Sequence, residues 1–334
     1  MFWFMRTTNI ASRWFVPARA NLRLLEPNLV RIEVDIPDGF KYLPGQHSFL
    51  RFGAVSPFDS HPFTIASAPP SGDEAPEAGK DKERLLFLTK VHEGFTRKLA
   101  LHCSMNGGKA KTRVVLDGPY GGLSRPRIES RYDSLLLIAG GSGISACLSW
   151  LLYVAAAISP AKMRNATLLW VVRDPQSFLW VCKELQRATN FKGDVRVNIN
   201  LYVTGEGEAS ESTGVSTPRL DKITATSSEP RAQEEFSEPR AHEESQNGRP
   251  RDEISQDGRS QDEGLRAMSE VTAGRPDLKA VVKEAVIPGK KLMIISCGPR
   301  GMNHDVANIC SDAQYMVLGG VAKEVALHVE TFGW

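Results

Sequence analysis

The chain has 334 residues, of which 41% are hydrophobic and 24% charged, and its formal net charge is +2. This composition is ordinary for a globular protein, and the length favours two domains because single domains typically hold ~100–200 residues. The nearly neutral balance, with no basic stripe dominating any segment, argues against a nucleic-acid-binding protein.

Five cysteines are spread along the sequence without a C-x-x-C pair. Their odd number argues against a disulfide framework and a structural zinc site, so we expect a reducing compartment and no bound metal. The chain starts with Met1-Phe2-Trp3-Phe4-Met5, an apolar stub that ends at Arg6. Residues 1–14 are therefore either a frayed terminus or the end of a membrane helix whose remainder is missing. No run in the chain reaches the ~18–20 apolar residues that a transmembrane helix needs.

Residues 15–125 are expected to form a β-rich domain. The run 29–36 alternates apolar and polar side chains as a half-buried strand does, and a Pro-Asp-Gly turn follows it. Further strands are predicted at residues 47–52, 85–91 and 112–116. Short strands with Gly and Pro between them predict an antiparallel β-barrel or sandwich.

Residues 131–334 differ in character. The runs 134–139, 167–172 and 292–296 are continuously apolar, as strands buried on both faces are, and helix-length stretches follow them. This alternation predicts a parallel α/β sheet. The expected fold is therefore α+β with two domains, an antiparallel β-barrel followed by an α/β nucleotide-binding domain.

An insertion interrupts the second domain at about residues 206–272. It is rich in Glu, Ser, Arg, Gln, Asp and Gly, with a near-repeat of the form Ser-Glu-Pro-Arg-Ala. Such a segment buries too little apolar area to offset its ordering entropy, so we predict that it is disordered. A tolerated loop insertion is favoured over a partner-binding role.

Two motifs in the first domain suggest cofactor contacts. His61-Pro62-Phe63-Thr64, with Ser67 nearby, places a ring and hydroxyls on a strand, which suits a flat heterocycle, although a plain buried strand explains it equally well. Gly94-Phe95-Thr96 follows the next strand. Gly94 allows close backbone approach and Thr96 can cap a helix over residues 97–101, whose N-terminus would suit a pyrophosphate; an ordinary N-cap is the alternative.

Two further motifs lie in the second domain. Gly140-Gly141-Ser142-Gly143-Ile144 stands between a predicted strand and helix, a setting that suits a phosphate, and Cys297-Gly298-Pro299 ends a later strand. Ligands of open parallel sheets bind at the carboxyl ends of the strands, so a dinucleotide could span both turns. Arg173 precedes Asp174 at the end of another strand. An arginine there favours the 2′-phosphate of NADPH, with a solvated surface charge as the alternative.

In this order the motifs resemble the ferredoxin-reductase superfamily and, within it, the ferric reductase and NADPH oxidase branch. The segments that carry the resemblance are Pro44-Gly45-Gln46-His47, His61-Pro62-Phe63-Thr64, Gly94-Phe95-Thr96, Asp117-Gly118-Pro119-Tyr120-Gly121, Ala139 to Ile144, Cys297 to Met302, and Glu330-Thr331-Phe332-Gly333-Trp334. The resemblance covers nearly everything except the insertion and the first dozen residues.

The resemblance implies a flavoprotein that passes electrons from NADPH to FAD. Phe63 would stack on the flavin, Thr64 would hydrogen-bond near its reactive nitrogen, and His61 with the backbone of residues 94–96 would hold the FAD phosphates. Residues 141–144 would bind the NADPH pyrophosphate, and Cys297 with Gly298 would flank the nicotinamide.

The resemblance also implies that Phe332 or Trp334 covers the flavin until nicotinamide displaces it. Thr64, Cys297 and Trp334 are thus the candidate catalytic residues. The candidate cofactor-binding residues are His61, Pro62, Phe63, Thr64, Ser67, Gly94, Phe95, Thr96, Gly140, Gly141, Ser142, Gly143, Ile144, Arg173, Cys297, Gly298, Pro299, Phe332 and Trp334.

The resemblance departs from the branch in three places. Soluble members often have arginine where His61 stands, and many have proline in place of Ala146. Full-length members carry a membrane bundle with paired histidines for haem, which this sequence lacks. The implied electron acceptor is therefore a haem-containing membrane domain, missing here or on a partner, or a ferric chelate, and the implied location is the cytosolic face of a membrane, the plasma membrane in full-length members.

Three other hypotheses remain open at this point. One is an NADPH oxidase-like module that generates superoxide, and another is a remnant that binds nucleotide without an electron path. A plain Rossmann dehydrogenase without flavin is the third, but it leaves the β-rich first half unexplained.

Overall fold

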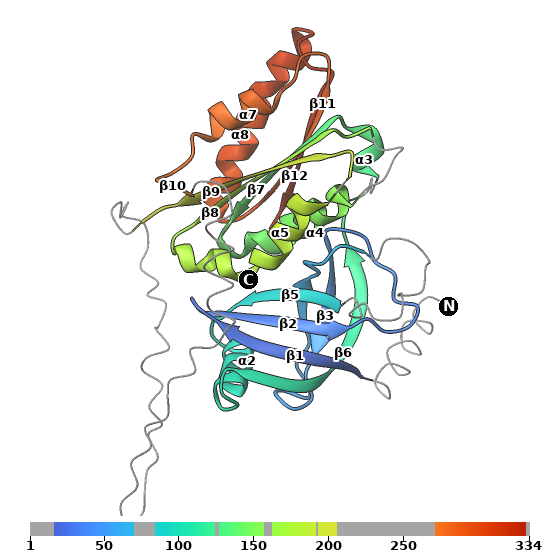
Figure 1. The fold of residues 1–334 in the computed structure, drawn as a ribbon, viewed down its shortest axis with the longest axis vertical. Coiled ribbons are helices and arrows are strands. Elements are labelled where there is room, and N and C mark those ends of the chain that lie inside the picture. The colour runs from blue at the N-terminus through green and yellow to red at the C-terminus, as the bar shows by residue number, and fades with distance from the viewer. Residues whose placement is uncertain are drawn as a thin grey trace, which may run out of the picture.

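A computed structural model describes residues 17–69, 84–123, 127–156, 162–191, 193–205 and 271–331. In these ranges the chain forms two six-stranded sheets that lie one above the other in Figure 1. The stub at residues 1–14, nearly all of the 206–272 insertion, and the candidate residues Phe332 and Trp334 lie outside the described residues.

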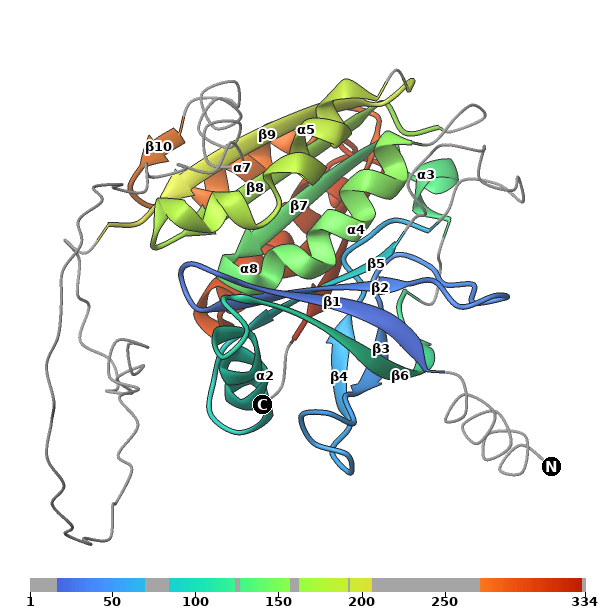
Figure 2. The ribbon, with the colours of Figure 1, turned by 60° about the horizontal axis from the view of Figure 1, so that its bottom comes forward.

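The first sheet is antiparallel and has the strand order β4-β3-β6-β1-β2-β5. Beyond β4, the backbone N–H of Ala66 donates to the carbonyl of Leu86 in β5 at 2.7 Å, so the chain after one outer strand reaches the other outer strand. Figure 2 shows the sheet strongly curved, in agreement with this contact between its two outer edges. The strands are β1 (Ala18–Leu25), β2 (Leu29–Asp35), β3 (Gln46–Arg51), β4 (His61–Thr64), β5 (Arg84–Lys90) and β6 (Lys109–Gly121), and one helix, α2 (Phe95–Ser104), follows β5.

Alternation explains why these strands form a curved sheet around a core. In β1 and β2 the even-numbered residues Ala20, Leu22, Val30, Ile32 and Val34 point inward and are almost fully buried, and Leu24 is partly buried. They pack with Leu50, Phe52 and Phe87. The odd-numbered residues of the same strands face outward and are largely polar.

The second sheet is parallel with the order β10-β9-β8-β7-β11-β12. Its central strands are buried on both faces, as the continuous apolar runs predict. Its strands are β7 (Ser134–Gly140), β8 (Asn165–Val172), β9 (Arg196–Val203), β10 (Val271–Ala273), β11 (Lys291–Cys297) and β12 (Glu324–Glu330).

Helices cover both faces of this sheet. Figures 1 and 2 place α4 and α5 on the face turned toward the first sheet, and α7 and α8 on the opposite face. The helical segments are α3 (Ile128–Arg131), η1 (Gly141–Gly143), α4 (Ile144–Ala155), η2 (Pro175–Trp180), α5 (Cys182–Asn190), α7 (Leu278–Ala285) and α8 (Arg300–Leu318). The predicted fold, an antiparallel first half and a parallel α/β second half, is confirmed.

One continuous core joins the two halves. Leu29, Ala66, Leu86 and Leu88 of the first half lie in the same buried cluster as most of α4. The hydroxyl of Ser149 in α4 also donates to the carbonyl of Ser67 at 3.1 Å. The sites of the two halves are therefore held in a fixed relation.

Candidate functional site

The carboxyl ends of β7 and β11 bring two loops into backbone contact. A Cβ added to Gly143 would lie 2.0 Å from the carbonyl oxygen of Cys297, so no side chain fits there. Gly140 and Gly298 pack equally closely, with a Cβ on Gly298 3.1 Å from the Cα of Gly140. The prediction that both glycine turns lie on one edge of the sheet is borne out by these contacts.

The loop from Gly140 to Ile144 leaves backbone donors for an anion. Gly141 has φ +54°, a Cβ added to it would meet nothing within 4 Å, and no side chain caps η1 or α4. The Trp170 indole donates to the carbonyl of Gly141 at 2.9 Å and fixes the loop. An open, uncapped helix start of this kind fits the pyrophosphate of a dinucleotide.

Asn303, which the sequence did not single out, and Glu330, the first residue of the C-terminal motif, are neighbours of this loop. Asn303, only 6% exposed, donates to the carbonyls of Gly298 and Glu330 and accepts from Ser296. Glu330 lies opposite Cys297 on the paired strands β11 and β12. The alternating Val325, Leu327 and Val329 could have revealed β12, but Asn303 belongs to no motif.

Cys297 is fully buried at the end of β11, and burial, aided by the charge of Glu330, raises the pKa of its thiol to about 12. The thiol therefore stays protonated near neutral pH. Since a thiolate is the reactive form, this position suits packing beside a bound ring rather than nucleophilic attack.

In the first half, β4 presents its residues alternately to the core and outward. Phe63 is 8% exposed and packs among core residues, with its ring 6.3 Å from that of Phe95. His61 stacks on Phe95 with ring centroids 4.4 Å apart. Its predicted phosphate contact and the stacking of Phe63 on a flavin stay predictions.

Thr64 lies on the strand face where the two halves meet. It stands opposite His47 in the pairing of β3 with β4. Burial lowers the pKa of His47, while the negative charge of Glu330 in the second half partly raises it. Glu330 stands opposite Cys297 in the pairing of β11 with β12, so Thr64 and Cys297 each neighbour one member of a pair, His47 and Glu330, whose charges interact between the halves.

The start of α2 differs in one detail from the prediction. Gly94, not Thr96, is the N-cap, with φ +76° and open space around it. Thr96 is the second residue of the helix, and its hydroxyl accepts from the N–H of His92 at 2.8 Å because the bend before the helix brings that N–H back. The helix start thus has no side-chain cap and remains a fitting phosphate site.

Ser67 is occupied by protein contacts. Its hydroxyl lies 3.0 Å from that of Tyr42 and accepts from the N–H of Leu86 at 3.2 Å. Pro62 lies opposite Phe49 in the strand pairing. Direct contact of Ser67 or Pro62 with a cofactor stays a prediction.

Two cations, Lys90 and Arg173, stand where β5 and β8 end. Burial lowers the pKa of Lys90, and the positive charge of Arg173 lowers it further. Asp174 uses its carboxylate to cap η2 by accepting from the N–H of Gln176 at 2.8 Å. The end of β8 therefore offers a cation to a ligand, and its carboxylate is already engaged.

Family comparisons agree with this arrangement. Residues 14–124 match a family of FAD-binding domains, and residues 132–311 match the ferric reductase NAD binding domain. This chain belongs to the ferric reductase family. The expected cofactors, FAD and a nicotinamide dinucleotide, are confirmed by the two ferric reductase domains.

Named relatives are similar over part of their length. The chain is 33% identical over 176 residues to the probable cell surface ferric reductase kap2 of Aspergillus oryzae, covering 52% of this chain and 23% of kap2. It is 28% identical over 299 residues to ferric reductase transmembrane component 4 of Saccharomyces cerevisiae, covering 88% of this chain and 38% of that protein. The chain thus spans well under half of these ferric reductases.

Among solved structures, the CS-b5R domains of human Ncb5or in the NAD+ form superpose with a TM-score of 0.51. The match is 14% identical and covers 94% of this chain and 69% of that one, which supports the fold alone. Across the described ranges of this ferric reductase chain, none of the helices combines the length and apolarity needed to cross a bilayer.

Proposed function

We propose that this chain is the NADPH:FAD electron-transfer module of a ferric reductase. Its division into an FAD domain at residues 15–125 and an NADPH domain at 131–334, interrupted at about 206–272, is part of the proposal. A bound flavin would accept a hydride from the nicotinamide and release electrons to a one-electron acceptor.

The observation that carries the proposal is the meeting of the two halves at one junction. The charge of Glu330 raises the pKa of His47, which stands opposite Thr64 on β3 and β4. Glu330 itself stands opposite Cys297 on β12 and β11. Two rings held from opposite sides of this junction would be aligned for direct transfer, and alignment is most of what such a reaction needs from the protein.

Different residues of the chain would bind FAD and NADPH. The start of α2 at Gly94 would receive the FAD phosphates, and the Gly140–Ile144 loop would receive the NADPH pyrophosphate. Thr64 would orient the flavin, while Cys297 and Gly298 would border the nicotinamide. Phe332 and Trp334, two and four residues beyond Glu330, would cover the flavin in the absence of nicotinamide.

The preference for NADPH rests on the end of β8. Arg173 and Lys90 supply two positive charges there, and the carboxylate that follows Arg173, that of Asp174, is engaged as a cap. A 2′-phosphate gains from such a pair, whereas the 2′-hydroxyl of NADH does not.

The terminal acceptor is proposed to be a haem in a membrane domain or a ferric chelate, at the cytosolic face of a membrane. The relatives support this, since they include a probable cell surface ferric reductase and a ferric reductase transmembrane component.

The test is anaerobic reduction of the FAD-loaded chain, followed at the flavin absorbance band. Faster bleaching with NADPH than with NADH, followed by reoxidation with ferric citrate, would support the proposal. Rapid superoxide formation in air would favour an oxidase instead. Flavin binding without bleaching would indicate an inactive remnant, and failure to bind FAD would contradict the proposal altogether.

A further inference from the structure

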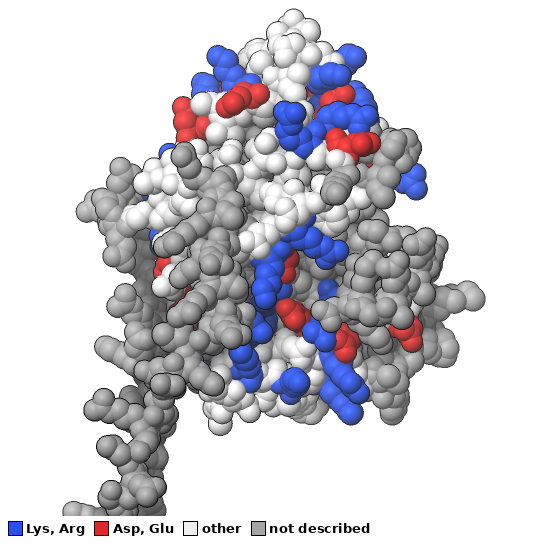
Figure 3. Space-filling view, viewed as in Figure 1, with Lys and Arg blue, Asp and Glu red and all other residues white. Residues whose placement is uncertain are grey.

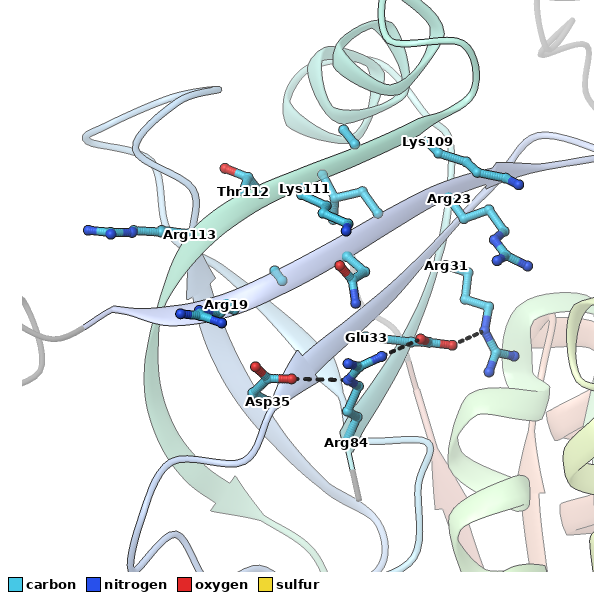
Figure 4. Close-up of a pocket in the computed structure, with 14 residues that line it drawn as sticks. Arg19, Arg23, Arg31, Glu33, Asp35, Arg84, Lys109, Lys111, Thr112 and Arg113 are labelled. Atoms are coloured by element: carbon cyan, nitrogen blue, oxygen red, sulfur yellow. Dashed lines mark hydrogen bonds and ion pairs between the residues drawn. The ribbon is translucent and has the colours of Figure 1, made fainter. Parts of the chain in front are cut away.

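The outward face of β1, β2 and β6 carries an unusual concentration of positive charge. It forms a shallow hollow of about 780 Å³ lined by seven basic and two acidic residues. Figure 3 shows the blue side chains running across the lower half of the molecule, over these strands, and Figure 4 shows them in close-up. We call it the basic face; its charged residues are Arg19, Arg23, Arg31, Glu33, Asp35, Arg84, Lys109, Lys111 and Arg113.

The two carboxylates of the basic face are already neutralised. Glu33 pairs with Arg31 at 2.9 Å and Asp35 pairs with Arg84 at 3.0 Å. Arg31 is held further by Glu184 of α5 at 2.6 Å. The excess positive charge therefore comes mainly from four other cations on β1 and β6, which are Arg19, Lys109, Lys111 and Arg113.

Strand pairing sets like charges against each other on this face. Arg19 stands opposite Arg113, Arg23 opposite Lys109, and Lys111 opposite Asn21. Like charges directly opposite each other on a sheet are destabilising. In the part of the chain that the structure describes, no carboxylate pairs with Arg19, Lys109, Lys111 or Arg113. The repulsion between these opposed cations lowers the stability of the free protein, and an anionic surface that covers the face would relieve it.

The geometry suits a broad, flat anion rather than a compact one. On β6 the cations stand at every second residue, about 7 Å apart, and on β1 at every fourth, about 13 Å apart, while the two strands lie about 5 Å from each other. None of the residues lining the hollow is aromatic, which leaves the bases of a single-stranded nucleic acid nothing to stack on. A layer of phospholipid headgroups matches a spread of point charges at such spacings.

The chain leading into the basic face supports the same partner. Arg19 is the second residue of β1, and the sequence before that strand includes Phe2, Trp3 and Phe4. Aromatic side chains favour the membrane–water interface, and basic residues collect on the cytoplasmic side. An apolar segment together with a basic patch gives the two signals that stable membrane association requires.

We propose that the basic face binds the anionic phospholipid surface of a membrane. Contact on this side leaves β4, the start of α2 and the β7 and β11 loops, which lie on other parts of the fold, open to the cofactors and acceptor. The proposal concerns binding alone and does not depend on electron transfer.

Flotation of the FAD-loaded full chain with vesicles tests the proposal. Vesicles of phosphatidylcholine are compared with vesicles that also hold about 30% phosphatidylserine. We expect binding only with phosphatidylserine, and its loss when the salt is raised from about 0.05 M to about 0.5 M. The variant Arg19→Gln/Lys109→Gln/Lys111→Gln/Arg113→Gln should bind about tenfold or more weakly while it keeps its flavin, because each cation near the surface contributes.

A matched control removes the same charge elsewhere. Arg196→Gln/Lys279→Gln/Lys283→Gln/Lys323→Gln changes four exposed cations of the second half and should bind vesicles as the parent chain does. Equal binding by all three proteins, equal binding to neutral vesicles, or no binding to phosphatidylserine would overturn the proposal. Binding to soluble polyglutamate but not to vesicles would do the same and would assign the face to an acidic protein.

Discussion

Thr64 has a hydroxyl at the point where the two halves of the molecule meet, opposite His47. Thr64→Ala should slow reduction of the flavin by NADPH about tenfold, because an orienting hydrogen bond is lost, with FAD still bound. Stopped-flow absorbance measures the rate. Thr112→Ala, on β6 of the same sheet, serves as the control. Unchanged reduction in Thr64→Ala would remove this residue from the site.

His47 gives the protein a predictable response to pH. Burial holds its pKa below the ordinary value of 6.5, so the unfolded chain takes up a proton at a higher pH than the folded chain does. The free energy of unfolding should therefore fall as the pH drops below 6.5. His92, whose pKa is also lowered by burial and by Lys90, acts in the same direction.

His47→Gln should make this decline shallower without abolishing it, as urea unfolding between about pH 7 and pH 5 would measure. Glu330→Gln should lower the pKa of His47 further, since the charge that raises it is gone. NMR titration of the histidine ring reports that shift. A rise in the pKa instead would separate Glu330 from the junction.

At this scale the sequence could predict motif residues but not their neighbours. Thr64, Gly143 and Cys297 belong to recognisable local patterns and lie at the junction or the loop edge. Asn303 and Glu330 reach that edge only through the pairing of β11 with β12 and the packing of α8, which are long-range contacts. A local pattern carries no information on such contacts.

At the scale of elements, the loops after β7 and β11 behave as one unit. Gly143→Ala would force its methyl group into the Cys297 carbonyl, which is rigid backbone, so one loop must move. We expect a loss of about 1–3 kcal/mol in the free energy of unfolding and much weaker nucleotide binding. Gly301→Ala, in open space within α8, should instead be neutral or stabilising by about 0.5–1 kcal/mol.

Urea unfolding measures the change in the free energy of unfolding, and fluorescence titration with NADPH measures the change in nucleotide affinity. Normal nucleotide affinity in Gly143→Ala would mean that the loops are independent.

Element types were predictable where a period was clear. The buried runs of β7, β8 and β11 and the alternation of β2 are nearly where the sequence places them. The helix-length stretch after β8 is η2 followed by α5, and η2 begins at Pro175 with Asp174 as its N-cap. β1 was not foreseen, since its outward positions are arginines and asparagine and its inner ones include small alanines.

For the whole molecule, hydrogen bonds of Arg31 and Trp180 clamp the two halves together. Arg31 of β2 donates to the Trp180 carbonyl at 2.9 Å and to Glu184, and both paired side chains are under a fifth exposed. The Trp180 indole donates back to the Glu26 carbonyl at 2.8 Å. Arg31→Met should cost about 1–3 kcal/mol, because it leaves Glu184 without its partner.

Arg84→Met breaks a more exposed pair and should cost no more than about 1 kcal/mol. Urea unfolding followed by far-UV circular dichroism and by flavin release should give coincident transitions in the parent chain. In Arg31→Met the flavin should leave first. Equal losses in the free energy of unfolding of the two variants would mean that the contacts of Arg31 do not hold the two halves together.

The basic face shows a further limit of sequence reading. Its cations alternate with buried residues on strands β1 and β6, which are more than eighty residues apart in the chain, so no segment reads as basic. The charge becomes visible only when the sheet brings the strands together.

The core shared by both halves constrains how such a protein can be divided or recombined. A first half produced alone would expose Leu29, Ala66, Leu86 and Leu88, the surface that α4 covers in the intact chain. It would aggregate unless another helix covered this patch. A nucleotide domain taken from another reductase would form a stable protein with it only if the α4 of that domain packed closely on the same patch. Natural exchange of the second half between reductases is thus restricted by how well α4 packs on this patch.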